Sequence, residues 1–156
     1  PWPWADCSVE EVLMLDFLEH FPWASTRPIL RECTRVLTAD GACIVQVPDL
    51  HHCALAATRT PGFMCNACGH RPSTKELVDE KNCVCGMAWI TVSQAAVMRL
   101  YGGQDRPGNT HLTAFTEDLL RWHALESGFS SFELLERNEN DETFFQNWNI
   151  RAVLRK

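Results

Sequence analysis

Four cysteines form two closely spaced pairs in the middle of the chain. Their pattern is C-x2-C-x14-C-x-C, and a glycine follows the second cysteine of each pair. Thiolates two or three residues apart can point at one metal ion, and four soft ligands favour zinc over calcium or magnesium. A closed set of four ligands leaves no open position for catalysis. The sequence therefore predicts a structural zinc site at Cys65, Cys68, Cys83 and Cys85, with two disulfides or free buried thiols as the alternatives.

Acidic residues and histidines follow two apolar runs of the sequence. The run 12–15 ends at Asp16, and the run 42–47 ends at Pro48 and Asp49. A helix between the runs would make them parallel strands, whose carboxyl ends meet at one edge of a sheet. Ligands of such sheets bind beyond that edge. The residues expected to converge on one cleft are Asp16, His20, Pro48, Asp49 and His111.

An amphipathic helix is expected between the two apolar runs. Ser25 and Thr26 are good N-cap residues, and Pro28 suits the first turn. Gly41 suits a left-handed turn that ends the helix. This strand–helix–strand unit predicts an α/β, Rossmann-like sheet.

The remainder of the chain predicts further helices and a closing pair of strands. Residues 50–64 are typical of a loop or short helix, 87–101 of a helix, and a third helix should begin at Thr116. Two strands, 132–136 and 144–154, close the chain. Apolar residues alternate in the last strand, which predicts antiparallel pairing with the strand before it.

Composition restricts the class of protein. The 156 residues are 46% hydrophobic and 22% charged, which is typical of one globular domain over 1–156, with residues 62–87 as an inserted zinc-knuckle subdomain. A net charge of −6 argues against nucleic-acid binding, and no apolar run approaches a membrane span. Without a signal-peptide pattern, and with clustered rather than dispersed cysteines, a cytoplasmic location is expected.

Several segments, taken in order, resemble the class I S-adenosylmethionine (SAM)-dependent methyltransferases. Two of them resemble the fourth strand with its "EH" segment and the turn before the fifth strand, and the later ones resemble the small-molecule and glycan-modifying branch. The segments that carry the resemblance are 12–22, 35–41, 101–104, His111, 115–116, 128–129 and the closing strand pair. The resemblance implies a mostly parallel sheet with an antiparallel last strand.

The resemblance covers only the carboxyl-terminal half of that fold. The family holds its cofactor mainly on a first strand and a glycine-rich turn, which precede the fourth strand. Here only 11 residues precede the first apolar run, and no G-x-G occurs. We therefore expect a half-domain that lacks the cofactor-binding half: a truncated gene product, an expressed fragment, or a subunit whose partner supplies the rest.

The resemblance also implies roles for single residues. Asp16, Phe17 and His20 would lie beside the methionine part of SAM, and His20 and His111 would be the catalytic candidates. A histidine can take a proton from an acceptor hydroxyl or amine during methyl transfer. Helix capping and surface hydrogen bonding are the alternative interpretations. The candidates for binding the acceptor, a small molecule or a glycan, are Asp49, His51 and Tyr101.

The sequence leaves two functions open. The first is SAM-dependent methyl transfer, once the missing half completes the enzyme. The second is a non-catalytic, zinc-containing binding or assembly module on a degenerate methyltransferase fold. We expect the chain alone not to bind SAM with useful affinity. Because the strand at 12–15 would become an open sheet edge, we also expect self-association, most simply as a homodimer.

Overall fold

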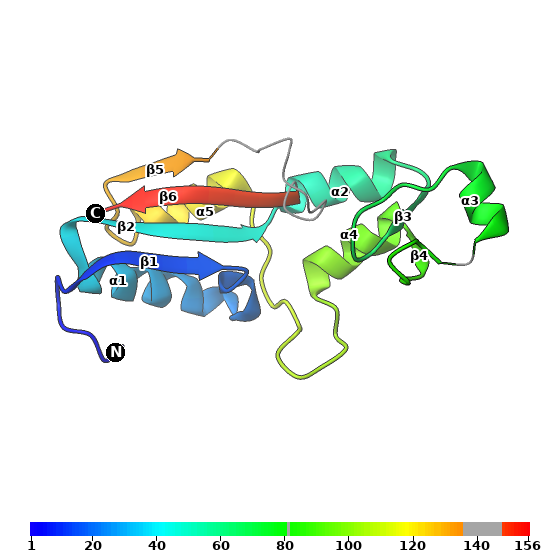
Figure 1. The fold of residues 1–156 in the computed structure, drawn as a ribbon. Coiled ribbons are helices and arrows are strands. Elements are labelled where there is room, and N and C mark those ends of the chain that lie inside the picture. Colours follow the sequence, from blue (N-terminus) through cyan, green and yellow to red (C-terminus); the bar gives the residue numbers. More distant parts are fainter. Residues whose placement is uncertain (81, 136–147) are drawn as a thin grey trace.

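A computed structural model describes residues 1–80, 82–135 and 148–156. Its main feature is a four-stranded sheet in the order β1-β2-β6-β5 (Figure 1). Strands β1 and β2 are parallel, whereas β6 is antiparallel to both of its neighbours. The predicted antiparallel pairing of the closing strands is therefore confirmed. The strands are β1 (Val9–Leu15), β2 (Leu37–Pro48), β5 (Ser131–Leu134) and β6 (Asn149–Arg155).

Helix α1 (Thr26–Val36) joins β1 to β2 and begins where the sequence predicted. It ends earlier than expected, because the chain turns directly into β2 at Leu37. The prediction that Gly41 ends the helix in a left-handed turn is wrong. Gly41 lies inside β2, where an added Cβ would come within 3.0 Å of the Leu37 side chain and the Thr38 carbonyl oxygen. The glycine serves close packing within the strand.

The bounds of the two outer strands of the sheet differ slightly from the prediction. Strand β1 starts at Val9, because Val9 already pairs with Leu37 of β2. Strand β5 ends at Leu134. The predicted residues Glu136 and 144–147 lie outside the described part of the chain.

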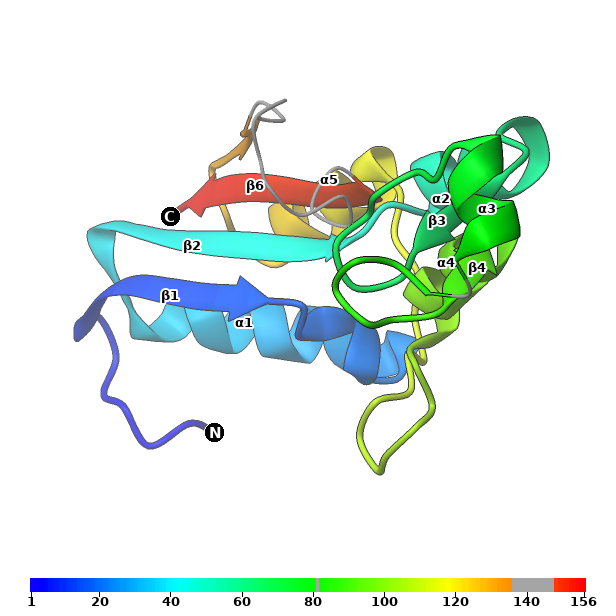
Figure 2. The same ribbon diagram turned by 45° about the vertical axis from the view of Figure 1, so that its right-hand side comes forward.

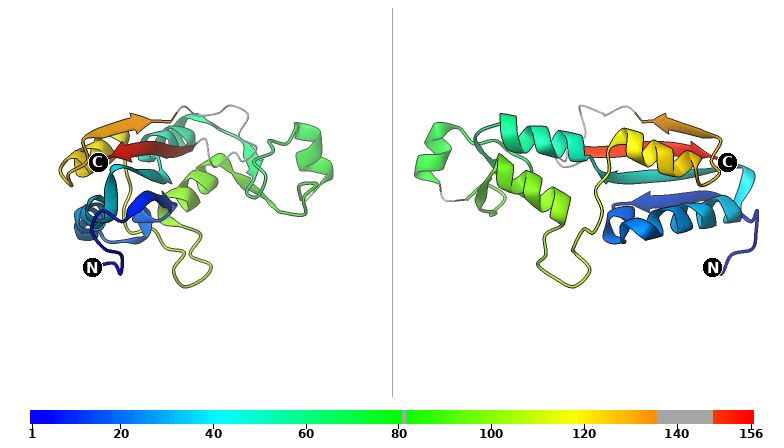
Figure 3. Two further views of the ribbon diagram at one scale, coloured as in Figure 1. Left: turned by 60° about the vertical axis from the view of Figure 1, so that its left-hand side comes forward. Right: turned by 180° about the vertical axis from the view of Figure 1, so that it is seen from behind.

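Helices α1 and α5 (Glu117–Leu125) cover one face of the sheet, as the rear view shows (Figure 3). Large aliphatic and aromatic side chains fill the space between them and the strands, including Leu30, Val45 and Leu120. In the described ranges no helix covers the opposite face of the sheet. There Leu13 and Leu15 are 57% and 49% exposed, although parallel strands are normally buried on both sides.

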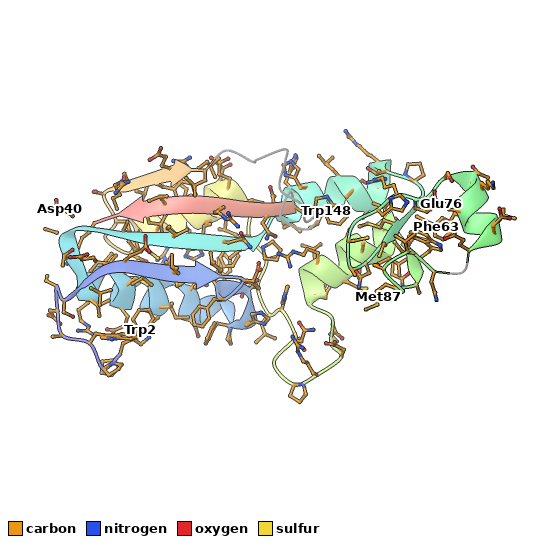
Figure 4. All side chains as sticks on the ribbon, in the orientation of Figure 1. Trp2, Asp40, Phe63, Glu76, Met87 and Trp148 are labelled. Carbon is orange, nitrogen blue, oxygen red and sulfur yellow. The ribbon has the colours of Figure 1, made fainter. Side chains whose placement is uncertain are left out.

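Residues 50–101 extend beyond the carboxyl end of β2, and we call them the projection (Figures 1 and 2). Its two longer helices pack on each other through small residues, with Trp148 beside them, just before β6 (Figure 4). Its short strands β3 and β4 pair antiparallel. The elements of the projection are α2 (Leu50–Arg59), β3 (Phe63–Cys65), α3 (Thr74–Asp79), β4 (Trp89–Thr91) and α4 (Val92–Tyr101).

The predicted helix over 87–101 is correct only in its second part. Trp89, Ile90 and Thr91 form β4, which pairs with β3. Helix α4 then begins at Val92, because the hydroxyl of Thr91 accepts a hydrogen bond from the backbone N–H of Gln94 at 3.0 Å. Pairing with a distant strand and a threonine cap therefore divide what looked like one element.

Candidate functional site

Asp16 follows β1 at the carboxyl edge of the sheet and has a positive φ of 50°. Its backbone N–H donates to the carbonyl oxygen of Gln46, 3.0 Å away, in β2. Its carboxylate accepts hydrogen bonds from Arg99 Nη2 at 2.8 Å and from Gln46 Nε2 at 3.2 Å. Arg99 also donates to the amide oxygen of Asn149. Asp16 therefore anchors a polar network that ties β1, β2 and β6 to α4.

Glu19 lies in the short 3-10 helix 18–20 after β1. Its side chain is fully buried, and its carboxylate has no hydrogen bond to another residue in the described ranges. Burial raises the pKa of Glu19 to about 7, and the nearby charge of Asp16 adds to this. The Glu19 backbone oxygen accepts hydrogen bonds from Leu112 and Thr113, which holds the loop before α5 against this segment.

The same contact brings His20 and His111 together. Their ring centroids lie 4.7 Å apart, and the Nδ1 atom of His20 is 3.2 Å from the carbonyl oxygen of Thr110. Burial lowers the pKa of His111, and the charges of His20 and Arg99 lower it further. The lowered pKa favours the neutral imidazole of His111, which carries a lone pair.

The residues expected to bind the acceptor do not all lie near His20 and His111. Asp49 is buried and caps α2, accepting hydrogen bonds from the backbone N–H groups of His51 and His52 and contacting the His52 ring at 2.5 Å. Tyr101, by contrast, is near His111, since its backbone oxygen accepts from the His111 N–H at 3.1 Å. Tyr101 and His111 line a cavity of about 180 Å³ together with Leu50, and neither Asp49 nor His51 is part of its lining.

The four clustered cysteines meet at the far end of the projection. Their Sγ atoms all lie within 4.8 Å of one another, with Cys65–Cys85 at 3.3 Å and Cys68–Cys83 at 3.6 Å. A disulfide measures about 2.05 Å, so these thiols are free. A tetrahedral zinc ion with bonds of about 2.3 Å holds its sulfur atoms about 3.8 Å apart. The four thiols therefore fit a zinc ion in number, type and spacing.

The backbone around the cysteines also suits metal binding. Gly69 and Gly86 have φ values of 73° and 86°, which let each loop turn back around its pair of thiols. Burial acts to raise the pKa of the Cys65 thiol, but backbone N–H groups of Cys68 and Ala67 outweigh it and lower that pKa to about 6. His70 is not placed as a ligand, because its Nε2 pairs with Glu76, 2.9 Å away.

The residues present do not form a complete site for SAM. The Asp16 carboxylate is already bonded to Arg99, and Phe17 lies in a different environment. Phe17 lines an apolar groove of about 560 Å³ along β1, together with Trp2, Trp4 and neighbouring residues. No glycine-rich turn is available to bring backbone amides close to a cofactor.

Sequence reasoning missed the residues that position Asp16. Arg99 was expected only as a helix residue, and Gln46 and Asn149 only as strand residues. All three are polar residues in largely apolar elements, a pattern that signals a specific partner when the position is buried. Glu19 was expected at this edge of the sheet as a weaker candidate than Asp16 and His20, but its full burial was not, because that burial depends on the distant loop 110–113.

Comparisons with known proteins identify the fold. No family model and no curated protein matches the chain. Similar solved structures include a SAM-dependent methyltransferase from Archaeoglobus fulgidus, with a TM-score of 0.50, 11% identity, 98% of this chain covered and 62% of the other. The CcbJ methyltransferase from Streptomyces caelestis has a TM-score of 0.50 and 14% identity, with 99% of this chain and 60% of the other covered.

A third similar structure contains ligands. It is the 1,6-didemethyltoxoflavin-N1-methyltransferase from Burkholderia thailandensis, bound to 1,6-didemethyltoxoflavin and S-adenosylhomocysteine, with a TM-score of 0.50, 11% identity, 97% of this chain covered and 45% of the other. The chain spans roughly half the length of the three similar structures, and it has the fold of SAM-dependent methyltransferases over that part.

Within the described ranges, no helix is both long and apolar enough to cross a membrane.

Proposed function

We propose that this chain is part of a SAM-dependent methyltransferase that modifies a small molecule or a glycan. The sheet supports this proposal most directly. Its order β1-β2-β6-β5, with two parallel strands followed by an antiparallel pair, corresponds to strands four, five, seven and six of the class I fold. In that fold the next strand toward the cofactor would pair with the outer edge of β1.

The outer edge of β1 and the neighbouring sheet face support the same proposal. In the described part of the chain no strand pairs with that edge. Leu13 and Leu15 are exposed on the open face, and the apolar groove lined by Trp2 and Trp4 runs beside them. We infer that the amino-terminal strands and helices of a methyltransferase fold cover this surface and carry most of the cofactor site.

The cavity lined by Tyr101 and His111 is the proposed position of the methyl acceptor. It lies beyond the carboxyl edge of the sheet, where α/β folds bind their ligands. His111 lines this cavity, and its lowered pKa favours the neutral imidazole, which can accept a proton or bind a metal ion. Asp16 and His20 are proposed to lie on the side of the cavity toward the cofactor.

Isothermal titration calorimetry with SAM tests the proposal. The isolated 156-residue chain should give no saturable heat at tens of micromolar protein. The product of the complete reading frame, with any co-expressed partner, should bind. Saturable binding to the isolated chain would show that the division of the cofactor site is wrong. Failure of the complete, folded product to bind would contradict the methyltransferase function.

We propose that Cys65, Cys68, Cys83 and Cys85 bind one structural zinc ion. Four thiolates at near-tetrahedral spacing leave no open coordination position, so the ion orders the projection and takes no part in chemistry. Elemental analysis of freshly purified, reduced protein should find at least one zinc per chain. Metal-free protein with an intact fold would refute this assignment.

A zinc-containing binding or assembly module is the second candidate function. Exposed apolar side chains near the cysteines favour it, with Phe63 at 43% and Met87 at 54% exposure (Figure 4). Such side chains are suited to contact with another polypeptide. A complete gene product that retains zinc but does not bind SAM would favour this function over catalysis.

In the isolated chain, the open edge of β1 and the exposed Leu13 and Leu15 favour self-association, most simply as a two-fold dimer. Light scattering should find a dimer at tens of micromolar protein. Leu13→Lys should shift it toward the monomer, because a charge on the open face opposes burial. A clean monomer for the unsubstituted chain would contradict the association.

A further inference from the structure

Three potential metal ligands meet at the carboxyl edge of the sheet, well apart in the sequence from the cysteines. They are Glu19 and His20, which follow β1, and His111, which lies in the loop before α5. One side-chain ligand atom from each lies within 4.8 Å of the others. About ninety residues separate His20 from His111 in the sequence. Hydrogen bonds from the Leu112 and Thr113 N–H groups to the Glu19 backbone oxygen bring the two segments together.

The carboxylate of Glu19 is the observation that points to a ligand. It is completely buried, and neither of its oxygens bonds to another residue in the described ranges. Buried carboxylates are normally paired, hydrogen-bonded or bound to metal. The nearby Asp16 is also acidic and cannot neutralise the Glu19 carboxylate. The cation Arg99 is already bonded to Asp16. A cation between Glu19 and the two imidazoles would satisfy the carboxylate.

We propose that Glu19, His20 and His111 bind a divalent first-row transition metal ion. One carboxylate and two imidazoles suit manganese, iron, cobalt or zinc better than calcium or magnesium, which prefer oxygen ligands alone. Three protein ligands leave open positions, which water or an oxygen atom of an acceptor can fill. The binding of the ion does not depend on the methyltransferase proposal.

The surrounding residues orient the ligands for this role. The Nδ1 atom of His20 faces the Thr110 carbonyl oxygen, so its Nε2 atom is left for a metal ion. Hydrogen bonding of the second ring nitrogen to a carbonyl is the usual arrangement for metal-binding histidines. His111 Nδ1 is buried and has no hydrogen-bond partner in the described ranges. Each histidine therefore has one nitrogen available for coordination.

The donor atoms distinguish this site from the cysteine cluster. Four thiolates prefer soft or borderline ions such as zinc, whereas a carboxylate with two imidazoles also accepts manganese. Manganese is therefore a selective probe once the cysteines hold one equivalent of zinc and excess zinc has been removed. It is also paramagnetic, so its ligands can be identified by spectroscopy.

The test is a manganese titration of the full chain that carries one equivalent of zinc for the cysteines and no excess zinc, followed by electron paramagnetic resonance. We expect one Mn²⁺ per chain, with pulsed spectra that show coupling to imidazole nitrogen. Glu19→Gln and His111→Gln should each weaken binding by more than about tenfold, the loss that follows even from disturbing an outer-shell partner. Glu126→Gln, at an exposed position, should leave it unchanged.

Circular dichroism verifies that each variant is folded, and Glu19→Gln preserves the size of the side chain. Three results would overturn the proposal. One is the absence of manganese binding at millimolar concentration in folded protein. Another is binding that Glu19→Gln does not weaken, which would indicate surface carboxylates. The third is bound manganese without nitrogen coupling, which would exclude the two histidines as ligands.

Discussion

The sheet and the projection contain similar kinds of elements but are stabilised differently. The sheet packs against α1 and α5 through large side chains such as Leu30, Phe115 and Leu154, all fully buried. The buried cluster of the projection consists mainly of small residues, three alanines with Cys53 and Val92, and its large members are Met64 and the neighbouring Trp148. Small residues bury little apolar area, and the free energy of burial grows with area.

The outer part of the projection has still less apolar burial. Val78 and Val84 are 80% and 89% exposed, and α3 has no buried residue. A unit this small cannot be held by a hydrophobic core alone and needs a cross-link or a metal. Apolar packing therefore fixes the fold of the sheet, whereas the outer projection has little apolar packing, and we propose that its four cysteines hold it together.

Removing one zinc ligand should have the largest effect and should confine it to the projection. Cys68→Ser breaks the four-thiolate set, and structural zinc typically contributes about 10 kcal/mol or more to folding. Hydrogen exchange measured by mass spectrometry should show loss of protection over 63–91 and unchanged protection in β2 and β6. Cys7→Ser, at an exposed thiol, is the matched control. Retained protection over 63–91 would mean that the cysteines do not order this unit.

Creating a cavity in the core between the sheet and its helices should destabilise the whole chain. Leu154→Ala removes a fully buried side chain from β6 and should cost about 2–5 kcal/mol of unfolding free energy. Denaturant unfolding provides the measurement. Leu125→Ala, at a side chain that is 47% exposed on α5, should cost much less. Equal losses would contradict the assignment of the core to this face of the sheet.

Arg99 is the test of how the two regions are joined. It extends from α4 of the projection to Asp16 and Asn149 of the sheet, and its side chain is only 17% exposed. Arg99→Met should cost about 1–3 kcal/mol, because it leaves the Asp16 carboxylate without its cation in a partly buried position. Differential scanning calorimetry should show the loss, and Arg106→Met in the exposed loop should not. If Asp16→Asn does not reduce the cost of Arg99→Met, the two side chains are not coupled.

The smallest expected effect is a pH dependence inside the sheet region. His123 is buried on α5, and burial and the charge of Arg27 lower its pKa. The unfolded chain then binds the proton more readily than the folded one, so stability should fall as pH decreases through about 6.5 and below. Melting temperatures at pH 7.5 and 5.5 should differ less in His123→Leu than in the unsubstituted chain. An identical pH dependence in both would exclude His123 as its source; His70→Gln is the exposed control.

Much of the sheet could be predicted because its strands are marked locally. Continuous apolar runs identify β1 and β2, and alternation identifies β6. Residues 87–101 were misassigned in part because β4 exists only through pairing with β3, which the local sequence does not show. Gly41 has the residue type of a turn, but packing against Leu37 and Thr38 decides its role.

The sequence by itself predicted that the four cysteines would meet, because their residue type and spacing lie in two short segments. It also determined that acids and histidines would follow the strands of a methyltransferase-like sheet. Only the tertiary structure decided which of them meet. Arg99 reaches Asp16 across 83 residues, and the loop 110–113 buries Glu19 beside His20 and His111. Such contacts depend on how separate elements pack, and burial then changes the charge and binding properties that each side chain has in water.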